Sequence, residues 1–488
     1  MRAWREDDVL VARFNVMLGP DQMPLEVGRW VLALADGATR PALPLRLTAS
    51  GSVSIDPVRD GKAFLLWRGR YEVAPRLASS DGSFELEVRM DRDAGRGSDE
   101  PILERLSRLL RRVGLRVRVA ALRTMYLTLR VVAQRNGRRI LFMSDYGTEL
   151  TDNLGLVYQR MVERGLDREY ELLTLTKPGL TVRRGLLDRL RLPWLLGRVD
   201  TIVIDKDQPV LHRVSGSRHR IIQLWHASGA IKTVGYSRIG TPHGPNPWSS
   251  VHKNYRFAIV SGEHDVPLYA EAFGIPEARV VPTGIPRMDP FFDARAREKG
   301  RRAALAALPA ARDRMVILFA PTFRGLLKEA TYDLDVLDYA RLHALCLEMD
   351  AVFVIRLHPQ VRRPLGIPGP FADRLLDGSA AVLHTSDLLF ATDLLITDYS
   401  SIVFEYSTLG RPMLFFAYDL ADYKAERDVY VPYEAFVPGR IVRTFDELVV
   451  AIRNHDYALE RVAPFAARHF AHPEGGATDR VVDLITGR

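Results

Sequence analysis

The chain has 488 residues, 47% of them apolar, and a net charge of +8 at pH 7. This length exceeds one ordinary core and predicts two or three domains, while the charge indicates an anionic partner: nucleic acid, phosphorylated substrate or acidic lipid surface. The single cysteine, Cys346, excludes a disulfide framework and a cysteine zinc cage and favours a reducing compartment such as the cytosol. No stretch reaches the roughly 18 apolar residues that span a bilayer, and no export signal is expected.

Residues 1–90 have the pattern of short β-strands. Runs such as VLVARFNVML and SFELEVRM are β-branched or alternate in polarity, and Gly, Pro and Asp turns separate them. We therefore expect a small all-β accessory domain at 1–90. Residues 91–137 are expected to hold a charged linker and a basic amphipathic helix at 102–113, where apolar residues fall at helical spacing and arginines take most other positions.

From about residue 138 the pattern changes to apolar strands that alternate with helical segments. The strand candidates are RRILFMS, TIVID, RIIQLWH, FAIVSG, MVILFAP, AVFVIRLHP, TDLLITDYSS and RPMLFFAY. Continuous apolar strands broken by helices indicate parallel sheets covered on both faces. An Arg/Ala-rich helical segment near 292–312 divides the strands into two groups. We therefore predict an α/β fold with two facing doubly wound, Rossmann-like domains, at 138–291 and 292–488.

Ligands of such sheets bind at the carboxyl ends of the strands, and LLITDYSSIVFEYSTLGRP, 394–412, contains one of these ends. The DYSS turn follows the strand, and a helix that ends near Gly410 follows the turn. A helix N-terminus offers unpaired N–H groups and neighbouring hydroxyls add donors, so Asp398, Ser400 and Ser401 are candidates for holding a phosphate. The alternative is that a serine only caps the helix and Asp398 satisfies the turn.

Other strands also end in polar side chains. His226 follows the strand in IIQLWHASGAIK, and Gly229 beyond it lets a ligand or backbone approach closely. His358 follows another strand, and Thr322 and Arg324 follow ILFAP. A lone histidine more often has a structural role. Two histidines, an arginine and hydroxyls at ends that are expected to face one cleft favour a ligand site.

These motifs, in this order, resemble the CDP-glycerol glycerophosphotransferases of wall teichoic acid synthesis. The similarity covers about 138–450 and is carried by SDYGTELTDNLGLVY, IQLWHASGAIKTVGYSRIG, FGIPEARVVPTGIPRMDPFF, ILFAPTFRG, IRLHPQ, LLITDYSSIVFEYSTLGRPMLFFAYDLADYKAERDVY and PYEAFVPG. The form WHASGAIK is similar to the polymerase branch. The resemblance implies a GT-B architecture, CDP-glycerol or another CDP-alditol as donor, a lipid-linked acceptor, release of CMP, and no required metal or cofactor.

The resemblance also implies roles for residues of this sequence. His226 is expected to be the general base toward the acceptor hydroxyl, since a neutral imidazole accepts a proton near pH 7, and His358 is expected to stabilise the diphosphate. The residues expected to bind the donor are Thr322, Arg324, Asp398, Ser400, Ser401 and Glu405, the last toward the ribose hydroxyls. Asp152 and Asn153 are expected on the acceptor side, or else as an ordinary helix cap.

A lipid-linked acceptor implies contact with a membrane. The segments 102–113 and 182–198, VRRGLLDRLRLPWLLGR, combine arginines with apolar residues as interfacial helices do. The residues expected to face an anionic membrane are Arg183, Arg184, Arg189, Arg191 and Trp194. This predicts a peripheral enzyme on the cytoplasmic face of the cell membrane. The alternative is that these helices pack on the core and leave their arginines in water.

Two other classes of protein remain open. A GT-B glycosyltransferase or epimerase that uses a sugar nucleotide has the same fold, because a fold does not fix function. A nucleic-acid-binding protein would share the positive charge. The sequence has neither an RNA-binding aromatic signature nor a zinc finger, so no nucleic acid is expected as a partner.

Overall fold

The computed structural model describes the backbone of seven N-terminal strands and most of the chain from Val117 onward. The described ranges are 117–133, 136–177, 185–238, 252–325, 330–361, 365–379, 383–423 and 430–488, apart from 118, 130, 146, 209, 213–218, 253 and 421–422. Within 186–190 only the backbone is described. The helix expected at 102–113, and the expected membrane-facing residues Arg183 and Arg184, lie outside these ranges.

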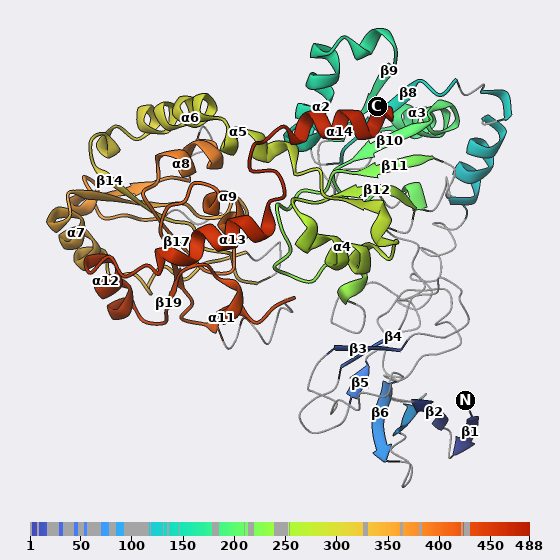
Figure 1. Ribbon diagram of the computed structural model, residues 1–488, viewed down its shortest axis with the longest axis horizontal. Helices are drawn as coiled ribbons and strands as arrows, with labels where there is room; N and C mark the ends of the chain where they lie inside the picture. The colour runs from blue at the N-terminus through green and yellow to red at the C-terminus, as the bar shows by residue number, and fades with distance from the viewer. Residues whose placement is uncertain are drawn as a thin grey trace.

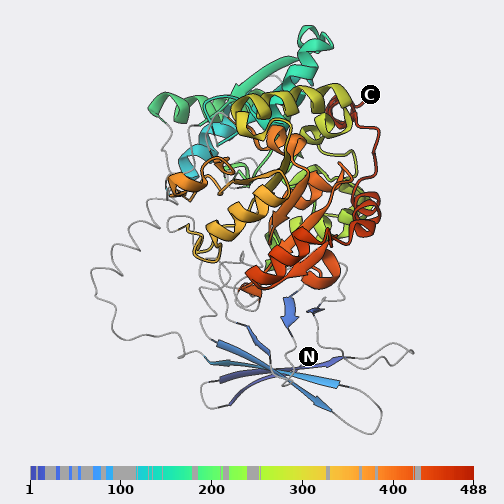
Figure 2. The same cartoon turned by 90° about the vertical axis from the view of Figure 1, so that its left-hand side faces the viewer.

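The N-terminal strands pair in antiparallel fashion, as expected of an all-β domain. One sheet has the order β1-β2-β7-β6-β5, and β3 pairs with β4. Figure 2 shows these N-terminal strands in blue. Their bounds are β1 (Arg2–Glu6), β2 (Val9–Val16), β3 (Arg29–Leu32), β4 (Leu43–Arg46), β5 (Val53–Ile55), β6 (Arg70–Leu77) and β7 (Phe84–Asp91).

The first of the two larger sheets has six strands, all parallel, in the order β13-β12-β11-β10-β8-β9 (Figure 1). The strands are β8 (Arg139–Met143), β9 (Glu171–Leu175), β10 (Thr201–Ile204), β11 (Arg220–Gln223), β12 (Tyr255–Ile259) and β13 (Val280–Val281). The helices that accompany them are α2 (Asp152–Glu163), α3 (Leu186–Arg198), α4 (Val266–Phe273) and α5 (Asp289–Phe292). These elements form the first unit.

The second sheet also has six parallel strands, in the order β16-β15-β14-β17-β18-β19. The strands are β14 (Met315–Phe319), β15 (Ala351–Ile355), β16 (Leu375–Asp377), β17 (Leu394–Thr397), β18 (Met413–Phe416) and β19 (Arg440–Val442). Its helices are α6 (Ala294–Ala307), α7 (Tyr339–Glu348), α8 (Thr385–Ala391), α9 (Ile402–Ser407), α11 (Tyr433–Phe436), α12 (Phe445–Arg453) and α13 (Val462–His469). These elements form the second unit, and the predicted pair of Rossmann-like folds is confirmed.

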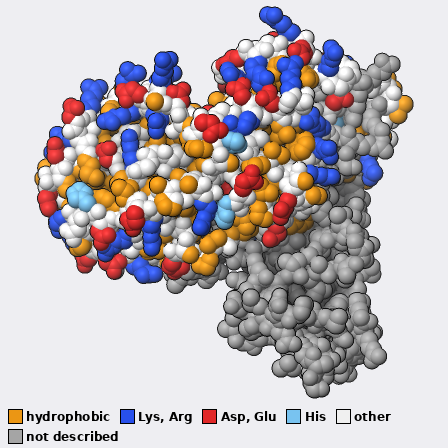
Figure 3. All heavy atoms as spheres, viewed as in Figure 1, with side chains coloured by type: hydrophobic (Ala, Val, Ile, Leu, Met, Phe, Trp, Pro, Cys, Tyr) orange, Lys and Arg blue, Asp and Glu red, His pale blue; other side chains and the backbone are white. Residues whose placement is uncertain are grey.

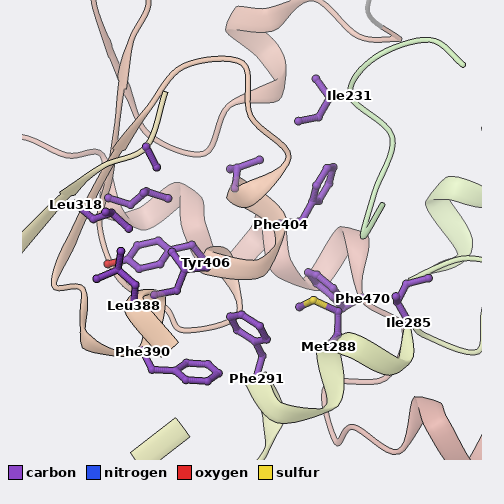
Figure 4. Packing of buried hydrophobic residues seen from close by; sticks show 14 of the residues in the cluster. Ile231, Ile285, Met288, Phe291, Leu318, Leu388, Phe390, Phe404, Tyr406 and Phe470 are labelled. Atoms are coloured by element: carbon purple, nitrogen blue, oxygen red, sulfur yellow. The ribbon is translucent and has the colours of Figure 1, made fainter. Parts of the chain in front are cut away.

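Both sheets are buried on both faces, which explains the continuous apolar strands of the sequence. Along β14, Val316 and Leu318 belong to one buried cluster, whereas Ile317 and Phe319 belong to another on the opposite face. Along β8, Ile140 and Phe142 likewise belong to one buried cluster, and Leu141 and Met143 belong to another. One cluster is common to the two units, and Figure 4 shows it where the units meet, with the labelled residues Ile231, Ile285, Met288, Phe404 and Phe470.

The helix α14 (Ala477–Thr486) follows the second unit in sequence but packs on the first. Figure 1 shows it, in red, beside α2. Three ion pairs join these segments: Arg160 to Asp479 and Arg164 to Asp483, each at 2.8 Å, and Arg164 to Asp479 at 3.4 Å. The chain therefore passes between the units twice, once near the domain boundary expected at 292 and again before α14.

Candidate active site

The loops after β14 and β17 lie at the point where the strand order of the second sheet reverses. The two strands pair directly, yet the chain leaves β14 toward β15 on one side and leaves β17 toward β18 on the other. In open α/β sheets, ligands bind outside the carboxyl ends of the strands at such a point. Thr322 and Arg324 follow β14, and Asp398 follows β17. The structure thus brings these sequence-predicted residues together.

Arg324 is held by carboxylates of the protein itself. Its guanidinium contacts both oxygens of Asp419, at 2.5 and 2.9 Å, and Oδ2 of Asp398, at 2.9 Å. Asp398 is only 2% exposed, and its Oδ1 also accepts hydrogen bonds from the N–H groups of Thr322 and Tyr399. Burial opposes the charge of Arg324, but the hydrogen bonds and charges of both carboxylates raise its pKa. The contacts of Asp398 with Arg324 and Thr322 therefore fix the loop after β17 to the loop after β14.

The hydroxyl groups at these strand ends have fewer partners. Oγ1 of Thr322 is buried and lacks a hydrogen-bond partner among the described residues. The Oγ of Ser400 accepts a bond from the N–H of Ile402 at 3.3 Å, which is the local role that the capping alternative assigned to a serine. Ser401 is the N-cap residue of α9, but it is exposed and its side chain makes no capping bond. The hydroxyls of Thr322 and Ser401 thus face no competing bond in the described part of the protein.

His226 lies at the carboxyl end of β11 in the first unit. Its side chain is exposed, while protein on the other sides of the ring, followed by the charges of Lys206 and Arg287, lowers its pKa to about 4. A hydrogen bond with the backbone of Asp205 acts in the opposite direction. The ring is thus open to solvent on one side and surrounded by protein on the other. The imidazole is therefore neutral and accessible at pH 7.

Two charged residues near His226 were not singled out in the sequence. Asp205 and Lys206 follow β10, whose neighbour β8 leads the chain the other way, so they lie at the reversal of strand order in the first sheet. Burial raises the pKa of Asp205 to about 6 and lowers the pKa of Lys206. The exposed Asp152 interacts electrostatically with Asp205, with Lys206 and with His226. The signal that could have found this site is the DKD motif directly after the strand TIVI.

His358 follows β15 in the second unit. Its Nδ1 accepts a hydrogen bond from the N–H of Gln360 at 3.3 Å, so in the neutral ring the proton is on Nε2, and its ring packs 4.8 Å from that of Phe323. Partial burial and the charge of Lys232 lower its pKa. Lys232 belongs to the loop after β11 and lies 5.6 Å from the ring of Tyr423. A cation of the first unit therefore stands near the histidine of the second.

The units meet through the loop after β11 and α9. Arg287, in the short turn before α5, was also missed in the sequence. It donates a hydrogen bond to Oγ of Ser228 at 3.0 Å and forms an ion pair with Glu405. Glu405 is 6% exposed and also accepts a hydrogen bond from Ser228. A Cβ on Gly229 would lie 2.3 Å from the ring of Phe404, so the close approach that this glycine permits is made by a side chain of the second unit.

Asn153 is buried rather than open to a ligand, with 1% exposure. Its Nδ2 donates to the carbonyl groups of Trp225, at 2.6 Å, and Leu224, at 3.4 Å. Its Oδ1 accepts from the N–H of Arg287 at 2.9 Å. Three backbone partners thus surround the residue expected on the acceptor side. Within the described ranges, no group of three or more side chains is placed to hold a metal ion.

Comparison with known proteins identifies the family to which the sequence is similar. A sequence model described as CDP-Glycerol:Poly(glycerophosphate) glycerophosphotransferase matches residues 124–487. The chain is 39% identical over 420 residues to teichoic acid ribitol-phosphate polymerase TarL of Staphylococcus aureus, which covers 86% of this chain and 75% of the relative. It is 28% identical over 270 residues to a teichoic acid glycerol-phosphate primase of Bacillus subtilis, covering 54% of this chain and 68% of the relative.

A solved structure of the wall teichoic acid polymerase TagF has a similar fold. It superimposes with a TM-score of 0.60 at 22% sequence identity and covers 79% of this chain and 97% of that one. At this identity the likeness concerns the arrangement of elements, which is a GT-B-like pair of facing α/β units.

Proposed function

This chain belongs to the CDP-glycerol:poly(glycerophosphate) glycerophosphotransferase family, and from that premise we propose that its donor is CDP-ribitol and that it extends a ribitol-phosphate polymer. As a member of this family, it transfers an alditol phosphate from a CDP-alditol to a teichoic acid acceptor. The choice of alditol depends on one observation. Relatives named for ribitol phosphate are 34–39% identical to the chain, and those named for glycerol phosphate are 24–28% identical.

In the proposed reaction, the acceptor hydroxyl oxygen attacks the phosphorus that bears the alditol. A new P–O bond forms to the acceptor, the P–O bond to CMP breaks, and CMP leaves with that electron pair. His226 takes the proton of the attacking hydroxyl, because its ring is neutral and accessible. His358 offers its Nε2–H to the diphosphate, and the positive charges of Lys232 and Arg287 offset the charge that develops there.

The donor is proposed to bind at the reversal point of the second sheet, where Thr322 and Ser401 have uncommitted hydroxyls. Ser400 lies on the same loop as Ser401, and its hydroxyl oxygen accepts the N–H of Ile402. Asp398 and Arg324 then act by holding these loops in place, since the guanidinium of Arg324 contacts Asp398 after β17 as well as Asp419. Glu405 is paired with Arg287, and its expected contact with the ribose stays a proposal. Asp152 stays a candidate for the acceptor side, because its charge reaches His226.

The donor proposal predicts a clear order of substrates. Purified protein with a short teichoic acid primer is expected to release CMP at least ten times faster from CDP-ribitol than from CDP-glycerol, and to release no UDP from UDP-sugars. Sizing of the products on a gel should show chains of several added units. Faster turnover of CDP-glycerol would overturn the choice of alditol, and UDP release would favour the glycosyltransferase alternative.

We also propose that the protein reaches its acceptor at the cytoplasmic face of the membrane through α3. In the described part of the chain, no helix has the length and apolar character to cross a bilayer. On α3, Arg191 is exposed, and Trp194 is 43% exposed and lies 4.2 Å from the guanidinium of Arg198. Figure 3 shows acidic side chains among the basic ones on the face it presents, so the proposal depends on this local pairing of arginine and tryptophan and not on net charge.

Binding to vesicles tests this surface. The combined change Arg191→Glu and Trp194→Ala is expected to reduce cosedimentation with anionic vesicles at least fivefold, since a basic residue near an anionic leaflet contributes about 1 kcal/mol. High salt should weaken the wild-type binding as well. Arg302→Glu on the exposed face of α6 has the same change of charge and is expected to bind like wild type. Equal binding of all three proteins would remove α3 from the membrane contact.

A further inference from the structure

The residue before His226 has an unusual backbone. Trp225 has a φ of +45°, in the left-handed region that favours glycine. For a bulky side chain this conformation costs on the order of 1–3 kcal/mol, so it persists only where neighbouring groups fix it. Backbone strain of this kind recurs beside functional groups because it sets the direction in which a side chain points.

Three sets of contacts hold Trp225. Its carbonyl oxygen accepts the 2.6 Å hydrogen bond from Nδ2 of Asn153, and its N–H donates to Oε1 of Gln223 at 2.9 Å. Its indole packs against the rings of Phe273 and Tyr269, with centroids 5.1 and 6.1 Å away. Both backbone polar groups of Trp225 are therefore fixed by buried side chains, and its ring packs against aromatic neighbours.

The amide of Asn153 joins this strained turn to a second part of the site. Its Oδ1 accepts the N–H of Arg287, whose side chain contacts Ser228 and Glu405. One buried amide thus sets the position of the peptide before His226 and of the arginine that contacts the second unit. Through Trp225, Asn153 positions His226 of the first unit. Through Arg287, it connects the first unit to Glu405 of the second.

We propose that Asn153 is a positioning residue that, through the left-handed backbone of Trp225, directs the imidazole of His226 toward the acceptor hydroxyl. This inference depends on the proposed role of His226 as the base. The chemistry of the site requires an amide. The carbonyl groups of Leu224 and Trp225 need hydrogen-bond donors, and the N–H of Arg287 needs an acceptor. The side-chain amide of asparagine supplies both on one planar group. A carboxylate would place a negative charge against both carbonyl oxygens, and an alanine would leave buried backbone groups without partners.

Turnover separates positioning from simple support of the fold. Asn153→Asp and Asn153→Ala are expected to lower kcat roughly 10–100-fold, because a shift of about 1 Å in a reacting group can cost about 100-fold. The KM for CDP-ribitol is expected to stay within about twofold, since the amide does not touch the donor site. Thr392→Val removes a buried hydrogen bond at the C-terminal end of α8, ahead of β17 and away from the carboxyl ends of the strands. It is the control for destabilisation alone, with wild-type kcat per folded molecule expected.

A double-mutant cycle with His226→Ala decides the matter. If Asn153 acts mainly through His226, the loss of kcat that Asn153→Asp causes becomes several-fold smaller once the imidazole has gone, and the remainder reflects the bond to the N–H of Arg287. An equal loss in both backgrounds, or wild-type kcat in folded Asn153→Ala, would overturn the inference. Should the Asn153 variants not fold, Gln223→Met removes the other bond to Trp225 and is expected to give the same pattern; an unchanged kcat there would also overturn it. Full activity of His226→Ala itself would instead refute the proposed base.

Discussion

The variant His226→Ala is expected to lose about 10²–10⁴-fold in kcat while it remains folded. The ring is exposed, and its ring contact is with the adjacent Trp225 at 4.4 Å, so its removal costs little packing. The loss of a general base typically has an effect of this size. CMP release under saturating CDP-ribitol and acceptor measures the change. His358→Ala is expected to lose most turnover as well, through the diphosphate. His343→Ala on α7, which removes a 2.9 Å hydrogen bond with Asp373, is the matched control with wild-type turnover.

The pH dependence of the wild type gives a second view of the same group. The pKa of His226 lies below its ordinary value, so the base loses its proton at lower pH and is competent at all pH values above about 4. The charges around it act in both directions: Lys206 and Arg287 favour the neutral form, and Asp152 favours the protonated form. The acid limb of kcat/KM should therefore fall near pH 4, if the enzyme stays folded there, because this quantity reports the free enzyme. A limb near pH 6.5 that persists in His226→Ala would assign it to another group.

The variant Arg324→Met is expected to lower the free energy of unfolding by about 3–5 kcal/mol. Removal of the guanidinium leaves Asp398, which is almost fully buried, and Asp419 without their shared cation, and breaking a buried pair costs about this much. The loss also removes a side chain packed near the rings of Tyr332, Tyr399 and Tyr423, at 5.0–5.4 Å. Arg324→Lys keeps the charge but not the planar fork, so an intermediate loss is expected.

Urea unfolding of the variant and of one control measures this effect. Arg341→Met breaks a 2.6 Å ion pair with Asp446 in which both partners are exposed, and a loss of at most about 1 kcal/mol is expected there. The sequence-based hypothesis makes a different prediction for Arg324, namely normal stability with weak binding of the donor. A wild-type unfolding curve combined with a raised dissociation constant for CDP-ribitol would instead support a direct contact of Arg324 with the donor.

The central strands were predictable from the sequence, and the outer ones were not. All eight strands expected from apolar runs occur, and the four that were missed, β9, β13, β16 and β19, are the outermost strands of the two sheets. An outer strand has a neighbour on one side only and can be short and partly exposed, as in ELLTL of β9. Its residues therefore lack the continuous apolar pattern that burial on all sides imposes.

The location of the site was also predictable, but the partners of its residues were not. His226, Thr322, His358 and Ser400 each follow a strand, and strand ends can be found from a sequence. The ion pair of Arg287 with Glu405 joins positions 118 residues apart in different units, and no local pattern signals it. Electrostatic partners depend on how closely two loops approach, which is a property of the assembled fold.

The return of α14 to the first unit has a consequence for the order in which the protein can assemble during translation. A ribosome releases the strands of the first unit well before α14, so α2 leaves the exit tunnel with Arg160 and Arg164 still lacking Asp479 and Asp483. Arg220 of β11 likewise has to wait for the carbonyl groups of Leu484 and Ile485. The second unit is contiguous between these points and can finish folding first. The part of the enzyme that is made earlier is thus completed last, as soon as α14 emerges.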